Sequence, residues 1–267
     1  MCSVFHVSTS AFYASLQRSS QPDHAPLRDS IRSIQSISDR TYGYRRVVPE
    51  LLSLGFDCGK KLVMRLMLEE GLQGRFKRTK PYGKATKPEV QTVPNALDRQ
   101  FLTTAPNQIW TSDITYIHTR SGWVYLAVVL DLYARMVVGW SVSQTPDSQL
   151  VVAALVSAVK KRHPGRGVMM HTDQGCQYTS SAWRTKLQQL GFRLSMSGRG
   201  QCWDNAPIES WNGILKRESR VITTLRSNAE EVRDVLFRWI DGWYNTRRRH
   251  SGIGYVSPAE FERNWAA

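Results

Sequence analysis

The 267-residue sequence has no apolar run of membrane-spanning length and no paired pattern of cysteines. Its longest apolar stretch, around Val124 to Leu130, has the length of a strand, far short of the roughly 18 residues of a spanning helix. The first residues lack the charged start, apolar centre and cleavage site of a signal peptide. The four cysteines form no CxxC pair, which argues against a zinc site or a disulfide framework. We therefore expect a soluble protein of the reducing cytoplasm.

Acidic residues are few compared with basic ones. Thirty-six Lys and Arg stand against 22 Asp and Glu, which gives a formal net charge of +14 and a pI near 9.9. A field of this sign attracts polyanions, so nucleic acid is the first partner to test and a membrane surface is the rival. The hydrophobic fraction of 41% is sufficient for one substantial core or two modest ones.

Residues 27 to 75 are predicted to form three short helices, because apolar residues recur there at helical spacing. The three sets are Ile31, Ile34 and Ile37; Val47, Leu51, Leu52 and Leu54; and Leu62, Val63, Leu66 and Met67. Gly55 and Gly59 separate the last two sets, as suits a helix-turn-helix. The candidate DNA contacts in this region are Arg45, Arg46, Lys60, Lys61 and Arg65. A helical bundle with solvated basic faces is the alternative. We assign residues 1–73 to this small all-helical region.

Residues 74–100 are predicted to be a basic linker. Between residues 74 and 94, six Lys or Arg are accompanied by proline and glycine, and Glu89 is the single acid. Such a segment has too little apolar surface to offset its ordering entropy, so it would become ordered only when phosphates neutralise it. A solvated tether is the other interpretation.

The pattern changes to strands after Ala105. Alternating or apolar runs predict strands at 109–117, 123–130 and 136–142, with a turn at Ser121-Gly122. Three strands with short links indicate an antiparallel meander. A helix at 150–159, a strand at 168–171, a helix at 180–190 and a strand at 192–195 follow. The fold class is therefore α/β, a mixed five-stranded sheet flanked by helices over residues 101–225.

The segment 226–267 contains the clearest helical pattern. Apolar residues at helical spacing run from Val232 to Tyr244, behind a cap at Ser227 or Asn228. The pattern ends in Arg247, Arg248 and Arg249, which are further candidate DNA contacts. We expect this helix and its basic tail to pack on the sheet domain.

Three carboxylates stand out by their setting. Asp113 lies inside the strand IWTSDITYI, Asp173 follows the strand VMMH and begins a turn, and Glu209 lies in the first turn of a helix that Asp204 or Asn205 would cap. Each also has an ordinary interpretation: the solvent face of a strand, a turn residue, and a favourable helix-dipole charge. Asp131 and Asp204 are weaker candidates, the first as a turn residue and the second as a helix cap.

If the three carboxylates meet, they cannot all remain ionised without cations. Hard oxygen ligands suit Mg²⁺ or Mn²⁺, and two such ions would activate an attacking oxygen and stabilise the leaving 3′ oxygen at phosphorus. Lys216, seven residues after Glu209, shares its helix face, and Arg217 follows it; both are candidate phosphate contacts. No Ser, Tyr or Cys has an obvious activating partner for covalent catalysis.

Together these motifs resemble the OrfB-type insertion-sequence transposases, relatives of retroviral integrases in the DDE superfamily. The resemblance rests on TYGYRR, WTSDITYI, HTDQGCQYTS, SMSGRGQCWDNAPIESWNGILKRE and YNTRRRHSGIGYVSPAEFE, and it covers most of the chain. Thirty-five residues, 174 to 208, separate Asp173 from Glu209, similar to the D-D(35)E spacing of that family, and Lys216 matches its following basic residue.

The resemblance implies an RNase H-like integrase core with Asp113, Asp173 and Glu209 as catalytic metal ligands. It implies cleavage at transposon ends followed by attack of the freed 3′ hydroxyl on target DNA, so double-stranded DNA is the expected substrate. Family members commonly act fused to a small upstream DNA-binding protein. We expect the chain to form a homo-oligomer on DNA. Through the DNA it would be associated with the bacterial nucleoid. A DNA-binding regulator with an inactive RNase H-like fold, and a plain nuclease, are the alternatives.

Overall fold

The computed structural model describes residues 8–10, 12–13, 24–74, 93–198, 200–221 and 224–266. It divides into two compact units, residues 1–75 and 76–267. Most of the predicted basic linker, residues 75–92, lies outside the described residues. In the part of the chain that is described, no helix has the length and hydrophobicity needed to cross a membrane.

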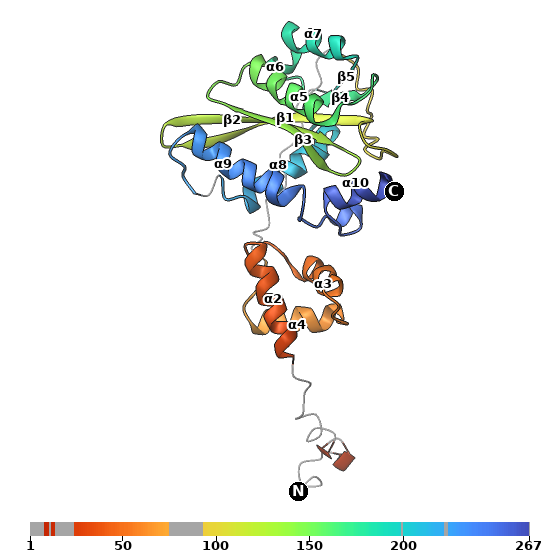
Figure 1. The fold of residues 1–267 in the computed structure, drawn as a ribbon, viewed down its shortest axis with the longest axis vertical. Coiled ribbons are helices and arrows are strands. Elements are labelled where there is room, and N and C mark those ends of the chain that lie inside the picture. The colour runs from red at the N-terminus through yellow and green to blue at the C-terminus, as the bar shows by residue number, and fades with distance from the viewer. Residues whose placement is uncertain are drawn as a thin grey trace. The chain divides into compact units, whose positions relative to one another are not determined.

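The first unit contains the three predicted helices, α2 (Ala25–Ile37), α3 (Tyr44–Ser53) and α4 (Lys60–Glu69) (Figure 1). Ile31, Val47 and Val63, one from each helix, are fully buried and form its centre. The expectation that Ile37, Leu52 and Leu54 lie on the buried faces is wrong. These three side chains are exposed because they lie in the last turn of a helix or directly after it, where the chain leaves the packed face.

Ion pairs connect the first helix of this unit to the last. Arg32 on α2 contacts Glu70 at 2.7 Å, and Arg28 contacts the same carboxylate at 3.1 Å. The buried Gln35 side chain donates to the backbone oxygen of Tyr42 at 2.7 Å and so holds the turn between α2 and α3.

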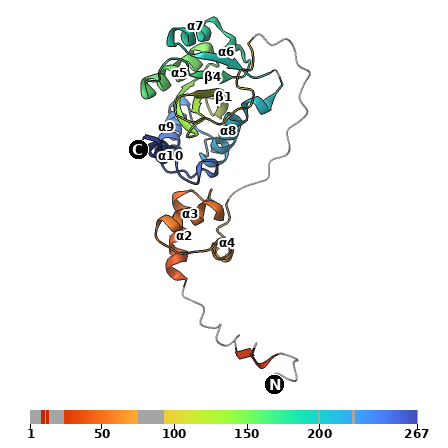
Figure 2. The same cartoon turned by 90° about the vertical axis from the view of Figure 1, so that its right-hand side faces the viewer.

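The second unit is built on a five-stranded sheet in the order β3-β2-β1-β4-β5. The predicted meander comprises β1 (Ile109–Thr119), β2 (Gly122–Asp131) and β3 (Met136–Ser143), and β4 (Met169–Thr172) and β5 (Arg193–Met196) run parallel to β1. The helices α5 (Ser148–Arg162), α6 (Cys176–Thr179) and α7 (Ser181–Leu190) cover one face. The other face carries α8 (Ala206–Glu218) and α9 (Ala229–Trp239), as Figures 1 and 2 show, and α10 (Pro258–Ala266) follows. The predicted α/β class is confirmed.

Strand alternation sends side chains into two cores, one on each side of the sheet. Trp110 and Val138 pack against α5 and α7, whereas Ile117 and Leu126 pack against α8 and α9. At Gly139 on β3, α5 approaches so closely that a Cβ atom would lie 2.5 Å from backbone atoms of that helix. Only glycine permits this contact.

The helix predicted from Val232 to Tyr244 changes its winding partway along. The side chain of Asn228 caps α9, and after Trp239 the chain forms one π-helical turn, η2 (Ile240–Tyr244). Asn245 follows. Its side chain accepts a hydrogen bond from the Val137 backbone nitrogen at 3.0 Å and donates one to the Val137 oxygen at 2.9 Å, on the edge strand β3.

Candidate active site

The sheet register brings Asp113 and Asp173 to the same level. The last parallel pairing between β1 and β4 joins Thr111 to His171, and each aspartate lies two residues beyond its partner in that pairing. Asp173 therefore lies just past the carboxyl end of β4, beside the point where β1 continues paired only with β2. This is the type of sheet position at which α/β proteins bind ligands.

Helix α8 lies along the face of β1 that carries Asp113. The Thr111 hydroxyl donates to Asn205 Oδ1 at 2.8 Å, and the Thr115 hydroxyl donates to Asn212 Oδ1 at 2.6 Å. Glu209 lies between the two asparagines at helical spacing, so it projects toward the same strand. Asp113, Asp173 and Glu209 all line one pocket of about 320 Å³, together with Gln174, Gly175 and residues of the loop 197–201.

The surroundings of the pocket raise the pKa of all three carboxyl groups. Burial, and next the charge of Asp173, raise the pKa of Asp113 to about 7, although the Ile114 backbone N–H and the charge of Lys216 oppose the shift. Burial also raises the pKa of Asp173, and burial followed by the charge of Asp173 raises that of Glu209. Carboxyl groups that raise one another's pKa are stabilised by bound cations.

The carboxylate oxygens are oriented but not saturated. Asp113 Oδ1 accepts from the Ile114 nitrogen at 2.8 Å, and Asp173 Oδ1 accepts from the Gly175 nitrogen at 2.9 Å. A Cβ atom at Gly175 would lie 3.0 Å from that same oxygen, so glycine leaves room for the carboxylate. The oxygen donor set fits a hard divalent cation. Among the described residues, however, no three His, Cys, Asp or Glu side chains are already gathered around a single metal position.

Asn212 is a site residue that the sequence did not reveal. Its Nδ2 donates to Asp113 Oδ2 at 2.7 Å, while its Oδ1 accepts from Thr115. Because a threonine hydroxyl donates to the amide oxygen, the amide nitrogen is directed at the carboxylate. A possible clue in the sequence was the spacing: Asn212 follows Glu209 by three residues, and Thr115 follows Asp113 by two.

The predicted basic contacts separate into two groups. Lys216 and Arg217 are exposed on α8, and the charge of Lys216 acts on Asp113. Arg248, in contrast, is 1% exposed, and its guanidinium contacts both carboxylate oxygens of Glu218 at 2.6 and 2.7 Å. It is thus engaged in the core and not presented to DNA in this structure.

The remaining predicted contacts lie nearer the surface. Arg247 is exposed, whereas Arg249 donates to the Tyr255 oxygen at 2.9 Å. In the first unit, the Arg45 and Arg46 guanidinium groups lie 5.8 and 5.5 Å from the ring centroids of Tyr44 and Tyr42. The exposed side chains of α4 include Lys60, Lys61 and Arg65.

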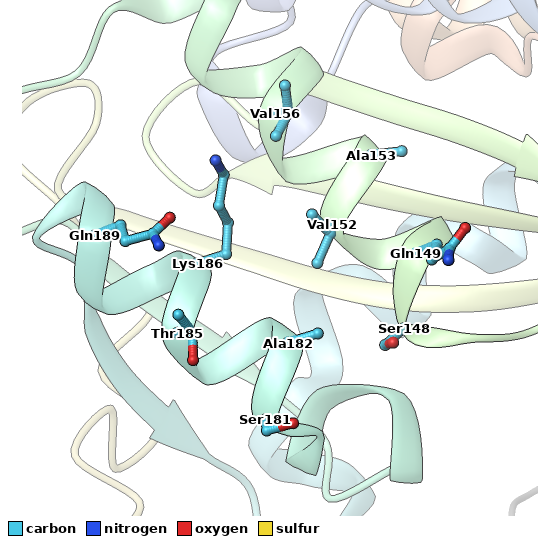
Figure 3. A pocket seen from close by; sticks show the side chains of 10 residues that line it. All are labelled: Ser148, Gln149, Val152, Ala153, Val156, Ser181, Ala182, Thr185, Lys186 and Gln189. Atoms are coloured by element: carbon cyan, nitrogen blue, oxygen red, sulfur yellow. The ribbon is translucent and has the colours of Figure 1, made fainter.

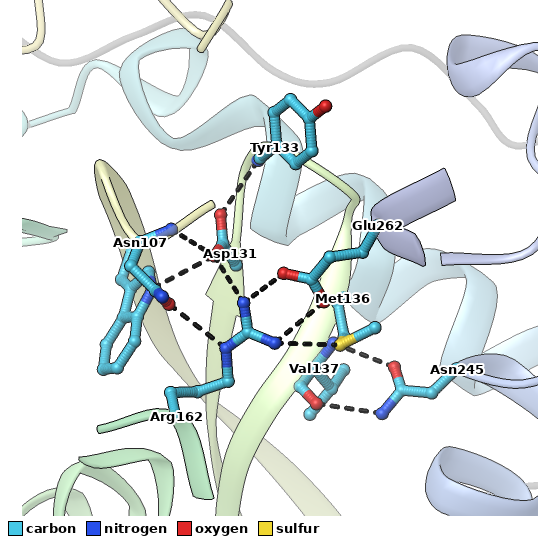
Figure 4. A network of polar contacts seen from close by, with 9 residues as sticks. Asn107, Asp131, Tyr133, Met136, Val137, Arg162, Asn245 and Glu262 are labelled. Carbon is cyan, nitrogen blue, oxygen red and sulfur yellow. Dashed lines mark hydrogen bonds and ion pairs between the residues drawn. The ribbon is translucent and has the colours of Figure 1, made fainter. Parts of the chain in front are cut away.

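Neither of the weaker acidic candidates belongs to the pocket chemistry. Asp131 is 1% exposed and accepts from the backbone nitrogens of Asn107 at 2.8 Å and Tyr133 at 3.0 Å. Figure 4 shows it beside Arg162, whose guanidinium also pairs with Glu262 of α10. This carboxylate therefore has a structural role: it connects the end of β2 to Arg162 of α5, which in turn pairs with Glu262 of α10.

Of the two predicted caps of α8, Asn205 occupies the N-cap position and Asp204 does not, but no side-chain capping hydrogen bond forms. The side-chain oxygen of Asn205 accepts from Thr111 instead. Asp204 contacts Arg99 at 2.7 Å and accepts from the Gly198 nitrogen at 3.2 Å. It therefore holds the loop that borders the pocket.

A second hollow of about 590 Å³ lies between α5 and α7, and Figure 3 shows its lining. Small and apolar side chains such as Val152, Val156 and Ala182 form most of it, with Lys186 beside them. None of its lining residues is an acid, a histidine or a cysteine. The hollow therefore offers no set of groups for metal binding or proton transfer.

Comparisons with known proteins agree with this geometry. The integrase core domain family matches residues 103–202, a second family of the same description matches residues 190–258, and an HTH-like domain matches residues 22–80. The transposase for insertion sequence element IS904 of Lactococcus lactis subsp. lactis (strain IL1403) is 37% identical over 243 residues, covering 91% of this chain and 96% of that protein. Transposase InsF for insertion sequence IS3A of Escherichia coli (strain K12) is 36% identical over 267 residues, covering 98% and 92%.

A solved structure is similar in fold. The simian T-cell lymphotropic virus intasome in complex with PP2A regulatory subunit B56 gamma matches with a TM-score of 0.50 and 14% identity, over 87% of this chain and 74% of that chain. At this identity the likeness concerns the fold alone.

Proposed function

Since this chain belongs to the insertion-sequence transposases with an integrase core domain, we propose that Asp113, Asp173 and Glu209 hold two divalent cations at which DNA strands are cut and joined. The chain is a DNA transposase, and its core domain is that of a polynucleotidyl transferase. The proposal concerns which residues carry the chemistry and how many ions they bind.

One observation carries the proposal: three acids from β1, the end of β4 and α8 line one pocket. The charge of Asp173 contributes to the raised pKa of both Asp113 and Glu209, and within the described residues none of the three forms an ion pair. An arrangement of this kind is unfavourable in a purely structural role, because buried charges in proteins are normally paired. The inactive-regulator alternative provides no reason to keep it.

Bound Mg²⁺ or Mn²⁺ would activate the attacking oxygen and stabilise the leaving 3′ oxygen. The residues of the chain orient the site. Ile114 and Asn212 each donate to one oxygen of Asp113, and Gly175 fixes an oxygen of Asp173. Lys216, exposed one turn of α8 beyond Asn212, would hold a phosphate of the bound strand.

Two displacements at phosphorus would use this site in turn. In the first, a water oxygen bonds to phosphorus at the transposon end as the bond from phosphorus to the 3′ oxygen breaks, which frees a 3′ hydroxyl. In the second, that hydroxyl attacks a phosphodiester of target DNA and displaces another 3′ oxygen. Both are in-line reactions and require no covalent intermediate with the protein.

DNA binding by the first unit and assembly on DNA complete the proposal. Lys60, Lys61 and Arg65 lie on one exposed face of α4, which suits a helix that contacts phosphates beside the major groove. We further propose that a homo-oligomer forms on the DNA, together with an upstream small DNA-binding protein or a fusion with it.

The test is strand cleavage and transfer on DNA that carries the ends of the element. With Mg²⁺, Asp173→Asn should lower both activities by about a thousandfold or more, because a metal centre contributes several kcal/mol to the transition state. DNA binding should persist. Asp234→Asn, at an exposed position on α9, is the matched control. Unchanged cleavage by Asp173→Asn contradicts the proposed ligands.

The joined product distinguishes a transposase from a plain nuclease. The wild-type chain should join a 3′ hydroxyl end to a second duplex, and a fusion to the upstream protein should increase the yield. Hydrolysis without any joined product, with the fusion as well as without it, contradicts the second step.

A further inference from the structure

The outer end of the β1–β2 hairpin carries four aromatic side chains, Tyr116, His118, Trp123 and Tyr125, here called the aromatic platform. Tyr116 lies opposite Tyr125 and His118 lies opposite Trp123 in the strand register. The ring centroids are 5.0 Å apart in each pair, and Tyr116 and Trp123 are 6.5 Å apart on the diagonal. The four rings therefore form one continuous surface.

Tyr116 and Trp123 are more exposed than is expected for rings that serve only to stabilise the hairpin. Cross-strand aromatic pairs stabilise a hairpin, which accounts for the pairing. However, Tyr116 is 53% exposed and Trp123 is 54% exposed, although large rings contribute most to stability when they are covered. The exposed apolar area is available for a ligand.

The charge around the rings suits a polyanion. Residues 114 to 125 include no Asp or Glu, and Arg120 at the tip of the hairpin is exposed. Exposed rings beside cations are the chemistry that binds single-stranded nucleic acid, in which bases stack on the rings and phosphates meet the cations.

The platform lies close to the carboxylate pocket along the same strand. Tyr116 follows Asp113 by three residues, which corresponds to about 10 Å along a strand. β1 pairs with β4 through residues 109–111, and Thr119 forms an isolated parallel bridge with Arg226; within the described residues no strand pairs with the edge of β1 between these points. The rings project from the face of β1 opposite Asp113, because side chains alternate. A DNA strand held at the pocket would therefore reach the rings by passing around β1 to the opposite face of the sheet, about 10 Å further along the strand.

We propose that the aromatic platform stacks unpaired bases of the DNA strand held at the carboxylate pocket; this rests on the proposed function. The platform keeps the reacting strand separated from its complement near the scissile phosphate. A second copy of the chain fits the surface less well. Both copies would carry a net charge of +14, and residues 114 to 125 supply no acid to attract the other copy.

The experiment measures binding of a fluorescent 12-nucleotide oligothymidine to the full chain in EDTA, at fixed salt, by anisotropy. Trp123→Ala and Tyr116→Ala should each weaken binding about tenfold, within the range expected for loss of one stacked base, and leave duplex binding within twofold. Trp265→Ala is the matched control, because Trp265 is also 53% exposed and also contacts a tyrosine ring, that of Tyr133. It should bind like the wild type.

Two further variants separate stacking from folding. Trp123→Leu keeps an apolar side chain at the position and should lose binding like the alanine variant, whereas Trp123→Phe should keep most of it. Wild-type oligonucleotide affinity in Trp123→Leu overturns the proposal. The proposal is also overturned if Trp123→Leu differs from the wild type in oligomer size, measured by sedimentation, but binds the oligonucleotide with the same affinity. That result would assign the surface to contact with a second copy.

The platform and the catalytic proposal can fail independently. Asp173→Asn should lose cleavage and keep oligonucleotide binding. If Trp123→Ala binds normally while Asp173→Asn is inactive, the platform is contradicted and the metal site is supported; the reverse pattern contradicts only the metal site.

Discussion

Two regions of the core domain each hold a carboxylate largely removed from solvent, the buried Asp131 and the half-buried Asp113, and they differ in what surrounds the charge. Burial raises the pKa of both Asp131 and Asp113. The largest influence on the Asp131 pKa after burial comes from backbone N–H groups that lower it, and the charge of Glu262 adds least; for Asp113 the largest influence after burial is the charge of Asp173, which raises its pKa further. Burial of an acid is thus a poor indicator of function. Like charges left together without a paired cation are the better one.

The largest effect on stability should come from the paired region. Asp131→Ala removes the acceptor of two backbone N–H groups and of the Trp110 indole N–H at 3.3 Å. We expect the free energy of unfolding to fall by about 3 kcal/mol or more, because buried donors lose their partner. Denaturant unfolding measures it. Asp113→Asn should cost far less, and equal losses in the two variants would remove the distinction between the regions.

A smaller effect should follow from disturbing the orientation of Asp113. Thr115→Val removes the hydroxyl that directs the amide of Asn212, and Asn212→Leu removes the amide itself. Either change should reduce kcat for strand cleavage about 10- to 100-fold and raise the Mg²⁺ concentration required, with little change in the KM for DNA. Thr115→Ser retains the hydroxyl and should keep near-normal activity. If Thr115→Val and Thr115→Ser behave alike, Asn212 is not held in this way.

The smallest effect is the pH dependence of stability without metal. The folded protein binds the Asp113 proton up to about pH 7, whereas the unfolded chain releases it near pH 4. Stability is therefore greatest below pH 4 as far as this group is concerned, and it declines as pH rises toward 7.

We expect a loss of about 1–2 kcal/mol between pH 5 and 8 in EDTA, since salt ions in the open pocket screen part of the repulsion. Asp113→Asn should show a shallower decline, and Mg²⁺ should restore wild-type stability at pH 8. Thermal melts across this range test both. If the melting temperatures of the wild type and of Asp113→Asn decline equally between pH 5 and 8, Asp113 does not titrate in this range.

Much of the sheet was predictable because strand alternation is local. The run from Ile109 to Ile117 indicates one face of a buried strand, and the short links after Ile117 and Leu130 leave an antiparallel meander as the simplest arrangement. The three carboxylates stood out in the sequence because Asp113 interrupts such a strand, Asp173 follows one, and Glu209 lies in the first turn of a helix. Their meeting in one pocket depends on the parallel pairing of β1 with β4, which involves residues about 60 positions apart.

Side chains whose role depends on a distant partner were not predictable. Arg248 lies in a run of three arginines typical of DNA contacts, yet Glu218, thirty residues away, holds it in the core. Asp204 precedes a helix and suits a cap, yet Arg99 takes its carboxylate. Asn212 belongs to the same class, because an asparagine on a helix shows no preference until Thr115 and Asp113 are placed beside it.

The side chain of Asn245 on the outer edge of β3 has a consequence for how copies of the protein can assemble. An exposed strand edge is a template on which another chain can add a strand, and this leads to aggregation or to continuous sheets. At Val137 both outward backbone groups are already taken by the Asn245 amide. Growth of the sheet from one molecule into the next is interrupted there. In the assembly on DNA proposed above, copies would therefore contact one another through other surfaces or through the DNA.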